Sequence, residues 1–288
     1  MSQYSYKLNI ADSVFQLDVP IPIELDENCR PFIVDSKETD IHIIYDIGMP
    51  QINSNETLVK DRDPRVWRGS AYFRVERHLL SSHPSGCIYL DDDEETVIRG
   101  VLYSDALVNI KQLVKLLEIS EPEILFARRK TISLHSSVVR LRDRAILFTA
   151  PSGTGKTTQA KLWEHYCGAE QLNGDRGFIK KENGIWTVYG APFSGTSGIY
   201  RNEYAPIQTI VVLRQSENNT IMRLSQSEAF RYLYSETVIP QWNSIACTSI
   251  VDIIANISKE IPVLLLCCTP DERAVKLLDS FLREENIC

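Results

Sequence analysis

The chain has 288 residues, of which 43% are hydrophobic and 24% are charged, a composition typical of a globular protein that buries a sizeable core. Its net charge of −7 disfavours nucleic acid or an anionic membrane as the main partner, because polyanions are bound through clustered Lys and Arg. The first residues lack a signal-peptide pattern, no apolar run reaches membrane-spanning length, and the seven cysteines show no C-x-x-C spacing. We therefore expect a cytoplasmic protein with reduced thiols and no membrane partner.

The first 103 residues alternate short β-like runs with turns that contain prolines and acidic clusters. The expected strands span residues 4–10, 14–19, 41–47, 71–75, 87–90 and 96–102. The acidic run at 91–95 is interpreted as a solvated turn between two strands, with a metal site as the alternative. Residues 1–103 are therefore predicted to form a smaller β-rich domain, for which no motif indicates a role.

The hydrophobic period changes after residue 103. Apolar residues recur at helical spacing, and Ser104 or Asp105 could cap the first turn, which predicts a connecting helix over 104–124. Beyond it we expect strands at 132–141, 145–149, 178–181, 185–189, 207–214, 220–224 and 263–268, and helices at 157–166, 227–236 and 242–260. A last helix should end near residue 284, with Thr269 as its N-cap and Pro270 at its first position. Residues 125–288 are therefore predicted to form a second domain, of the α/β class.

The strongest functional signal is a glycine-bearing loop between a predicted strand and a predicted helix. Its residues are Pro151, Ser152, Gly153, Thr154, Gly155, Lys156, Thr157 and Thr158, and Ala150 stands at the first glycine of the pattern G-x-x-x-x-G-K-[ST]. In such a loop, backbone N–H groups and a helix N-terminus converge on phosphates. Lys156 can reach the β and γ phosphates, and the Thr157 hydroxyl can ligate Mg²⁺. The loop predicts ATP and Mg²⁺ as cofactors, against the alternative of a Gly-rich turn without a ligand.

A carboxylate is expected near this loop, to help hold Mg²⁺ and to accept a proton. The best candidate is Asp175, which lies between the helix after the loop and the next strand. The alternative is an aspartate in a surface turn beside Gly174. Arg176 has two possible interpretations, a contact to phosphate or a structural ion pair with its neighbour Asp175.

Two further features carry candidate residues. His135 lies on the strand before the turn into the loop strand, where an isolated histidine is more often structural than functional. The segment 190–202 is rich in small residues and contains Arg201. It is either a connector or a substrate loop whose backbone amides approach an anion, and we favour the second interpretation.

These motifs, in this order, resemble those of the HPr kinase and phosphoenolpyruvate carboxykinase superfamily of P-loop phosphotransferases. The resemblance covers roughly residues 125–285 and is closest up to residue 177. It is carried by three segments, Leu134-His135-Ser136-Ser137, 151–158, and Leu172-Asn173-Gly174-Asp175-Arg176. Arg176 follows Asp175 where that family usually carries a second acidic residue. Segment 190–202 is more similar to divergent HPr-kinase-like proteins that accompany peptide natural-product clusters.

The resemblance implies a P-loop kinase domain of this type, with functional roles for the matching residues. It implies that His135 meets the phosphates, that Lys156 and Thr157 hold the nucleotide, and that Asp175 acts as base or helps hold the metal. Arg201 joins them as a candidate catalytic residue.

Two hypotheses follow. The first is a kinase that transfers the γ-phosphoryl group of ATP to a hydroxyl of a Ser or Thr in a peptide or protein, or of a small alcohol such as serine. The second is a nucleotide-binding regulatory or assembly module without phosphotransfer. Asp175 and His135 favour the first, because binding alone needs neither. Association into a homo-oligomer is left open.

Overall fold

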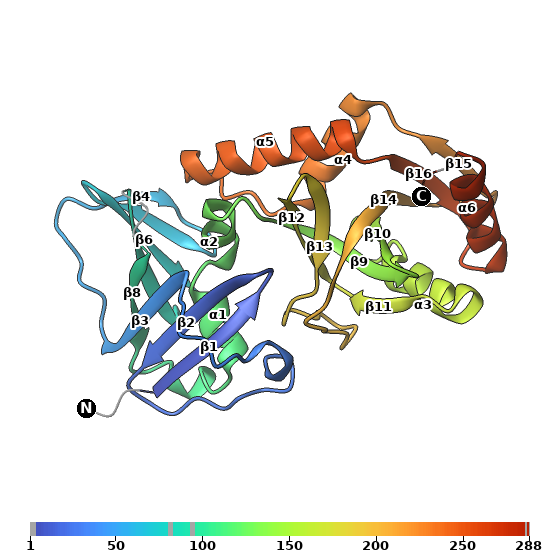
Figure 1. The fold of residues 1–288 in the computed structure, drawn as a ribbon. Helices are drawn as coiled ribbons and strands as arrows, with labels where there is room; N and C mark the ends of the chain where they lie inside the picture. The colour runs from blue at the N-terminus through green and yellow to red at the C-terminus, as the bar shows by residue number, and fades with distance from the viewer. Residues whose placement is uncertain (1–3, 80–82, 93–95, 286, 288) are drawn as a thin grey trace. The chain divides into compact units, whose positions relative to one another are not determined.

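The computed structural model describes residues 4–79, 83–92, 96–285 and 287 (Figure 1). Its contacts divide the chain into two compact units, the first formed by 1–129 with 240–244, and the second by 130–239 with 245–288. Each unit is built on an eight-stranded sheet, and helices accompany both sheets. The mixed α/β class predicted from the sequence is confirmed.

The first unit contains a mixed sheet with the strand order β1-β2-β3-β8-β7-β6-β5-β4. Strand β3 pairs in parallel with β2 and β8, and the other neighbours are antiparallel. The strands are β1 (Tyr4–Ile10), β2 (Ser13–Val19), β3 (Ile41–Gly48), β4 (Thr57–Lys60), β5 (Arg65–Arg68), β6 (Tyr72–Arg77), β7 (Gly86–Asp91) and β8 (Val97–Tyr103). The six expected strands are confirmed, whereas β4 and β5 were not predicted. Of the acidic run, Asp92 pairs with Arg68 at 2.6 Å, and residues 93–95 lie outside the described part of the chain.

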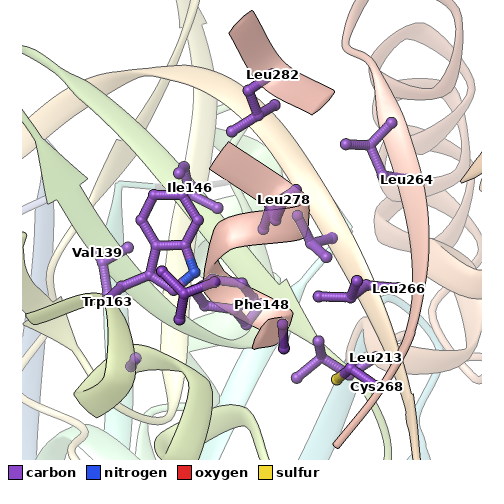
Figure 2. Close-up of a cluster of buried hydrophobic side chains, with 14 of the residues drawn as sticks. Val139, Ile146, Phe148, Trp163, Leu213, Leu264, Leu266, Cys268, Leu278 and Leu282 are labelled. Carbon is purple, nitrogen blue, oxygen red and sulfur yellow. The ribbon is translucent and has the colours of Figure 1, made fainter. Parts of the chain in front are cut away.

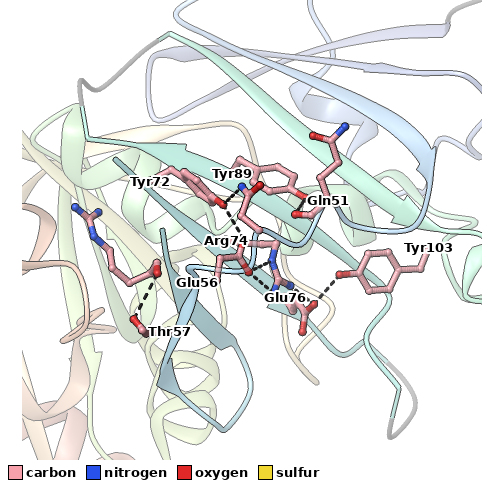
Figure 3. Close-up of polar contacts among 10 residues, drawn as sticks. Gln51, Glu56, Thr57, Tyr72, Arg74, Glu76, Tyr89 and Tyr103 are labelled. Carbon is pink, nitrogen blue, oxygen red and sulfur yellow. Dashed lines mark hydrogen bonds and ion pairs between the residues drawn. The ribbon is translucent and has the colours of Figure 1, made fainter. Parts of the chain in front are cut away.

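A buried charge cluster occupies the interior of this first unit (Figure 3). The Arg74 guanidinium donates to Glu56 Oε2 through Nε at 2.9 Å and also forms an ion pair with Glu76. Glu76 accepts a further hydrogen bond from the Tyr103 hydroxyl at 2.9 Å. Because each buried charge has an opposite partner, the cost of removing it from water is offset locally.

The prediction of one helix over 104–124 is wrong, because the first α-helix starts later and the segment is divided into several helices. The chain forms the 3-10 helix η2 (Leu107–Asn109) and then two short helices, α1 (Leu113–Ile119) and α2 (Pro122–Arg128), all within the first unit. Neither Ser104 nor Asp105 caps a helix. Instead Asp26 Oδ2 accepts from the backbone N–H of Val114 at 3.0 Å, so the first turn of α1 is capped from a distant loop.

The second unit is organised by two long strands that each belong to two sheet segments. The first half of β9 pairs with β12 and its second half with β10, while β14 pairs with β13 and then, in parallel, with β10 and β16. The strands are β9 (Ile132–Leu141), β10 (Arg144–Thr149), β11 (Glu170–Asn173), β12 (Arg176–Glu182), β13 (Ile185–Tyr189), β14 (Tyr204–Gln215), β15 (Thr220–Arg223) and β16 (Val263–Cys268). The parallel strands β10, β14 and β16 therefore end at one edge of the sheet.

A hydrophobic core holds β10 and its neighbours against helices α3 and α6 (Figure 2). Trp163 of α3 is fully buried beside Phe148 of β10, with ring centroids 6.2 Å apart. Leu278 and Leu282 of α6 face Leu264 and Leu266 of β16 in the same cluster. The helices of this unit are α3 (Lys156–Cys167), α4 (Gln226–Glu236), α5 (Ser244–Glu260) and α6 (Glu272–Glu284). This packing fixes the end of β10 and the start of α3, and so the loop between them.

The predicted cap of α6 is wrong by two residues. Asp271 is the N-cap, and its Oδ1 accepts from the backbone N–H of Arg273 at 2.9 Å. Thr269 is instead held by Asn219, whose Oδ1 accepts from the Thr269 N–H at 2.8 Å. Among the described residues, no helix is long and apolar enough to span a membrane.

Candidate functional site

The loop 150–157 connects the end of β10 to the first turn of α3, at the edge where the parallel strands end. Its two glycines have positive φ angles, 79° at Gly153 and 117° at Gly155, which glycine adopts without steric cost. Thr154 N–H donates to the Pro151 carbonyl at 3.3 Å, closing a turn within the loop. The loop therefore has the strand, turn and helix N-terminus that phosphate binding requires.

Lys156 is the first residue of α3, and its side chain turns into the loop. Its Nζ donates to the Ala150 carbonyl at 2.8 Å, and the residue is only 7% exposed. Burial lowers the pKa of Lys156 from its ordinary value, while the nearby carboxylates Glu236 and Asp175 act in the opposite direction. The ammonium group is therefore held at the loop, where it is influenced by the charges of two carboxylates from different elements.

Asp175 lies in a tight turn between β11 and β12. The Asn173 Oδ1 atom accepts from the backbone N–H groups of Asp175 and Arg176, both at 2.8 Å, which fixes the turn. The Asp175 carbonyl accepts from the N–H of Ser136 on β9 at 3.0 Å. The aspartate proposed from the sequence therefore lies beside the strand that carries His135, and its charge reaches Lys156.

Segment 190–202 packs directly against this turn. The Asn173 Nδ2 group donates to the carbonyls of Ala191 and Phe193 at 2.9 and 3.1 Å. A Cβ atom on Gly195 would lie 2.7 Å from Asp175 Oδ1, so only glycine permits this approach. The small residues of the segment let its backbone reach the Asp175 carboxylate.

His135 is the third polar group at this edge. It lies opposite Arg176 in the β9–β12 register, and its carbonyl accepts from the Thr149 hydroxyl at 2.9 Å. Its Nδ1 lies 3.1 Å from Glu236 Oε2. Glu236, the last residue of α4, was not identified from the sequence, since a single glutamate in an amphipathic helix gives no signal of its own.

A cavity of about 610 Å³ opens beside the first half of the loop. It is lined by Ala150, Pro151, Ser152, Gly153, Thr154, Val212, Leu213, Arg214, Gln215, Tyr232, Ser235 and Glu236. Arg214 Nη2 donates to the Tyr232 hydroxyl at 2.8 Å and joins the end of β14 to α4. The cavity thus combines the loop backbone with an exposed guanidinium and with the carboxylate that pairs with His135.

Arg176 and Arg201, the two arginines that the sequence indicated as candidates, have different surroundings. Arg176 forms an ion pair with Asp175 at 3.5 Å and lies over the Phe193 ring at 5.3 Å. Arg201 is about half exposed, and its guanidinium lies 3.9 Å from Glu203. Its backbone N–H donates to the Leu172 carbonyl at 3.1 Å, so the segment is anchored although the side chain is not.

The residues present fit a magnesium ion held together with nucleotide phosphates. Mg²⁺ in such sites is bound through one or two protein oxygens, substrate phosphates and water, rather than by an all-protein cage. Within the described ranges no three His, Cys, Asp or Glu side chains form a metal-binding group. The Thr157 hydroxyl at the start of α3 and the Asp175 carboxylate are the donors of the expected type.

No protein-family model and no curated protein matches this sequence. Among solved structures, the chain is similar to the Hpr(Ser) kinase/phosphatase from Coxiella burnetii. That match has 12% identity and a TM-score of 0.33, and it covers 54% of this chain and 90% of the other. So distant a similarity assigns no activity, and the functional assignment rests on the residues of this chain.

Proposed function

We propose that this chain is an ATP-dependent kinase that transfers the γ-phosphoryl group to a hydroxyl acceptor. The acceptor is a Ser or Thr of a peptide or protein, or a small alcohol such as serine. Residues 151–158 hold the phosphates, and Lys156 contacts the β and γ groups. Thr157 and Asp175 would together hold a Mg²⁺ ion, which would neutralise charge on the phosphates. Arg201 belongs to the acceptor side, because its segment packs against the Asp175 turn.

One observation carries this proposal. Lys156 is buried at a glycine-bearing loop, and the nearby charges that act on it are the carboxylates of Asp175 and Glu236. A site that only binds a triphosphate gains nothing from added negative charge, because carboxylates repel phosphates. Carboxylates are useful where a proton must be accepted or a metal must be held.

The reaction follows from these positions. The acceptor oxygen bonds to the γ-phosphorus as the bond to the β–γ bridging oxygen breaks, so ADP leaves and the hydroxyl proton passes to Asp175. Lys156 exchanges its hydrogen bond to the Ala150 carbonyl for phosphate oxygens. The contribution of the protein is mainly positioning and charge stabilisation.

The test is to incubate the protein with ATP labelled in the γ-phosphate and a cell extract, and to identify the labelled acceptor by mass spectrometry. The proposal expects a phosphorylated hydroxyl that is absent with Lys156→Met. Label recovered only as inorganic phosphate would favour the alternative, a nucleotide-binding regulatory or assembly module.

A further inference from the structure

Glu236 is held in a fixed position at the end of α4. Its side chain is only 10% exposed, and the next residue, Thr237, forms an isolated β-bridge with Leu134 of β9. The Thr237 hydroxyl also donates to the Leu233 carbonyl at 2.7 Å. The end of α4 is therefore attached to the strand that carries His135, and the carboxylate cannot move far from the imidazole.

The contact between Glu236 and His135 determines which ring nitrogen carries a proton. An ionised carboxylate can only accept, so the 3.1 Å contact places a hydrogen on Nδ1 of His135. Within the described part of the chain, Nε2 makes no hydrogen bond. The other charged groups nearby are Lys156 from α3, Asp175 in the turn before β12, and Arg176 across from His135 on β12.

Glu236 also lines the cavity beside the loop, where an unpaired carboxylate would repel a triphosphate. Its pairing with His135 offsets that repulsion. Nε2 then faces away from the carboxylate, and it donates a hydrogen only when the ring is doubly protonated, the form that anions on both sides of the ring favour. We propose that Glu236 is a positioning residue that acts through His135, orienting the imidazolium so that Nε2–H meets the phosphoryl group of bound ATP. This role rests on the proposed function, since it requires a triphosphate at the loop.

The pairing predicts that Glu236→Gln changes the affinity for Mg·ATP in opposite directions in the wild-type protein and in His135→Ala. In the wild-type protein, Glu236→Gln should weaken Mg·ATP binding about tenfold, because His135 loses its charge partner and an amide fixes the ring less strictly than an acceptor-only carboxylate. In the His135→Ala protein the carboxylate is left unpaired near the phosphates, so adding Glu236→Gln should strengthen binding by roughly three- to tenfold. A residue with a purely structural role would weaken binding in both backgrounds.

Calorimetry of Mg·ATP binding to the four full-length proteins measures this coupling, with Asp252→Asn on the exposed face of α5 as a control of equal charge change. Imidazole ¹⁵N spectra of the two proteins that keep His135 should show Nδ1–H in the wild type and a larger share of the Nε2–H tautomer in Glu236→Gln, because an amide can also donate to Nδ1 whereas a carboxylate can only accept. His42, whose Nε2 lies 2.6 Å from Asp18 in the first unit, serves as an unaffected internal standard that also reports folding.

An equal loss from Glu236→Gln in both backgrounds would overturn the proposal, as would a His135 spectrum that does not depend on Glu236. The failure of the kinase assignment looks different. Suppose that Glu236→Gln weakens Mg·ATP binding in the wild type and strengthens it in His135→Ala, but the wild-type protein phosphorylates no acceptor. The role of Glu236 in nucleotide binding would then stand, and the proposed transfer reaction would be wrong.

Discussion

The carboxylate of Glu236 lies 3.1 Å from Nδ1 of His135, although 101 residues separate them in the sequence. The backbone of Asp175 is held by its turn, and Gly195 approaches the carboxylate. The buried ammonium thus feels two carboxylates, one paired with an imidazole and one that pairs with Arg176 and remains about a third exposed. This asymmetry suits Asp175 to the acceptor hydroxyl and Glu236 to the nucleotide.

The first prediction concerns Lys156. Mg·ATP at 100 times its Kd should raise the Tm of the wild-type protein by roughly 5–10 °C, because a ligand of the native state stabilises it by mass action. Lys156→Met should abolish this shift. The unliganded variant should melt at or above the wild-type Tm, since it no longer buries an ammonium group. Differential scanning fluorimetry measures both, and an equal ATP shift in the variant would exclude this loop as the phosphate site.

The second prediction is a dependence of ATP affinity on pH. Burial lowers the pKa of Lys156 below 10.5 in the free protein, whereas phosphates stabilise its charged form in the complex. Affinity should therefore be full below the free-state pKa and should fall as the pH rises through it, starting below 10.5. Calorimetry between pH 7 and 10 should show this decline in the wild type and a flatter profile in Lys156→Met. Parallel profiles would mean that Lys156 does not contact the nucleotide.

The third prediction uses two glycines of segment 190–202. Both Gly195 and Gly198 have positive φ, so alanine at either position costs roughly 1–2 kcal/mol of backbone strain. Only at Gly195 would the added Cβ meet the Asp175 carboxylate, at 2.7 Å, because Gly198 faces open space. Gly195→Ala should therefore reduce phosphoryl transfer far more than Gly198→Ala, at similar losses of Tm. Equal rates in single-turnover assays of the two variants would show that segment 190–202 does not position Asp175.

The fourth prediction concerns Arg201, whose side chain is about half exposed and 3.9 Å from Glu203. That separation is too long for a hydrogen bond, so the guanidinium is free to turn toward an acceptor or the transferred group. Arg201→Ala should reduce transfer at least about tenfold while ATP affinity stays unchanged, because charge on the equatorial oxygens develops in the transition state. Calorimetry and single-turnover rates separate the two effects. Equal losses in both would place Arg201 in the nucleotide pocket.

The sequence predicted those parts of the structure whose signal is local. The loop 150–157, the strands β12 and β13 and the buried strand β16 follow from glycine positions, alternating patterns and uninterrupted apolar runs. The sequence did not predict β4, where Leu58 and Val59 are both about half exposed and give no alternating pattern. The start of α1 was missed because its cap, Asp26, lies 88 residues away from Val114.

The candidate site was predicted only in part, for the same reason. His135, Lys156 and Asp175 were predicted from motifs, and the β9–β12 register and the loop geometry place them at one edge. Glu236 reaches them through tertiary packing of α4 against β9, which leaves no trace in local sequence. The approach of Gly195 to Asp175 likewise depends on a close packing of two loops that spacing does not encode.

The most direct test of the proposed kinase is a comparison of wild-type protein and Asp175→Asn in one single-turnover experiment with labelled ATP and the identified acceptor. An amide cannot take the hydroxyl proton and gives less charge to the metal, so transfer should fall at least about 100-fold. ATP affinity should remain within a few-fold of wild type, because Lys156 and the loop backbone are unchanged. Transfer by Asp175→Asn at the wild-type rate would contradict the account, since the base would then lie elsewhere.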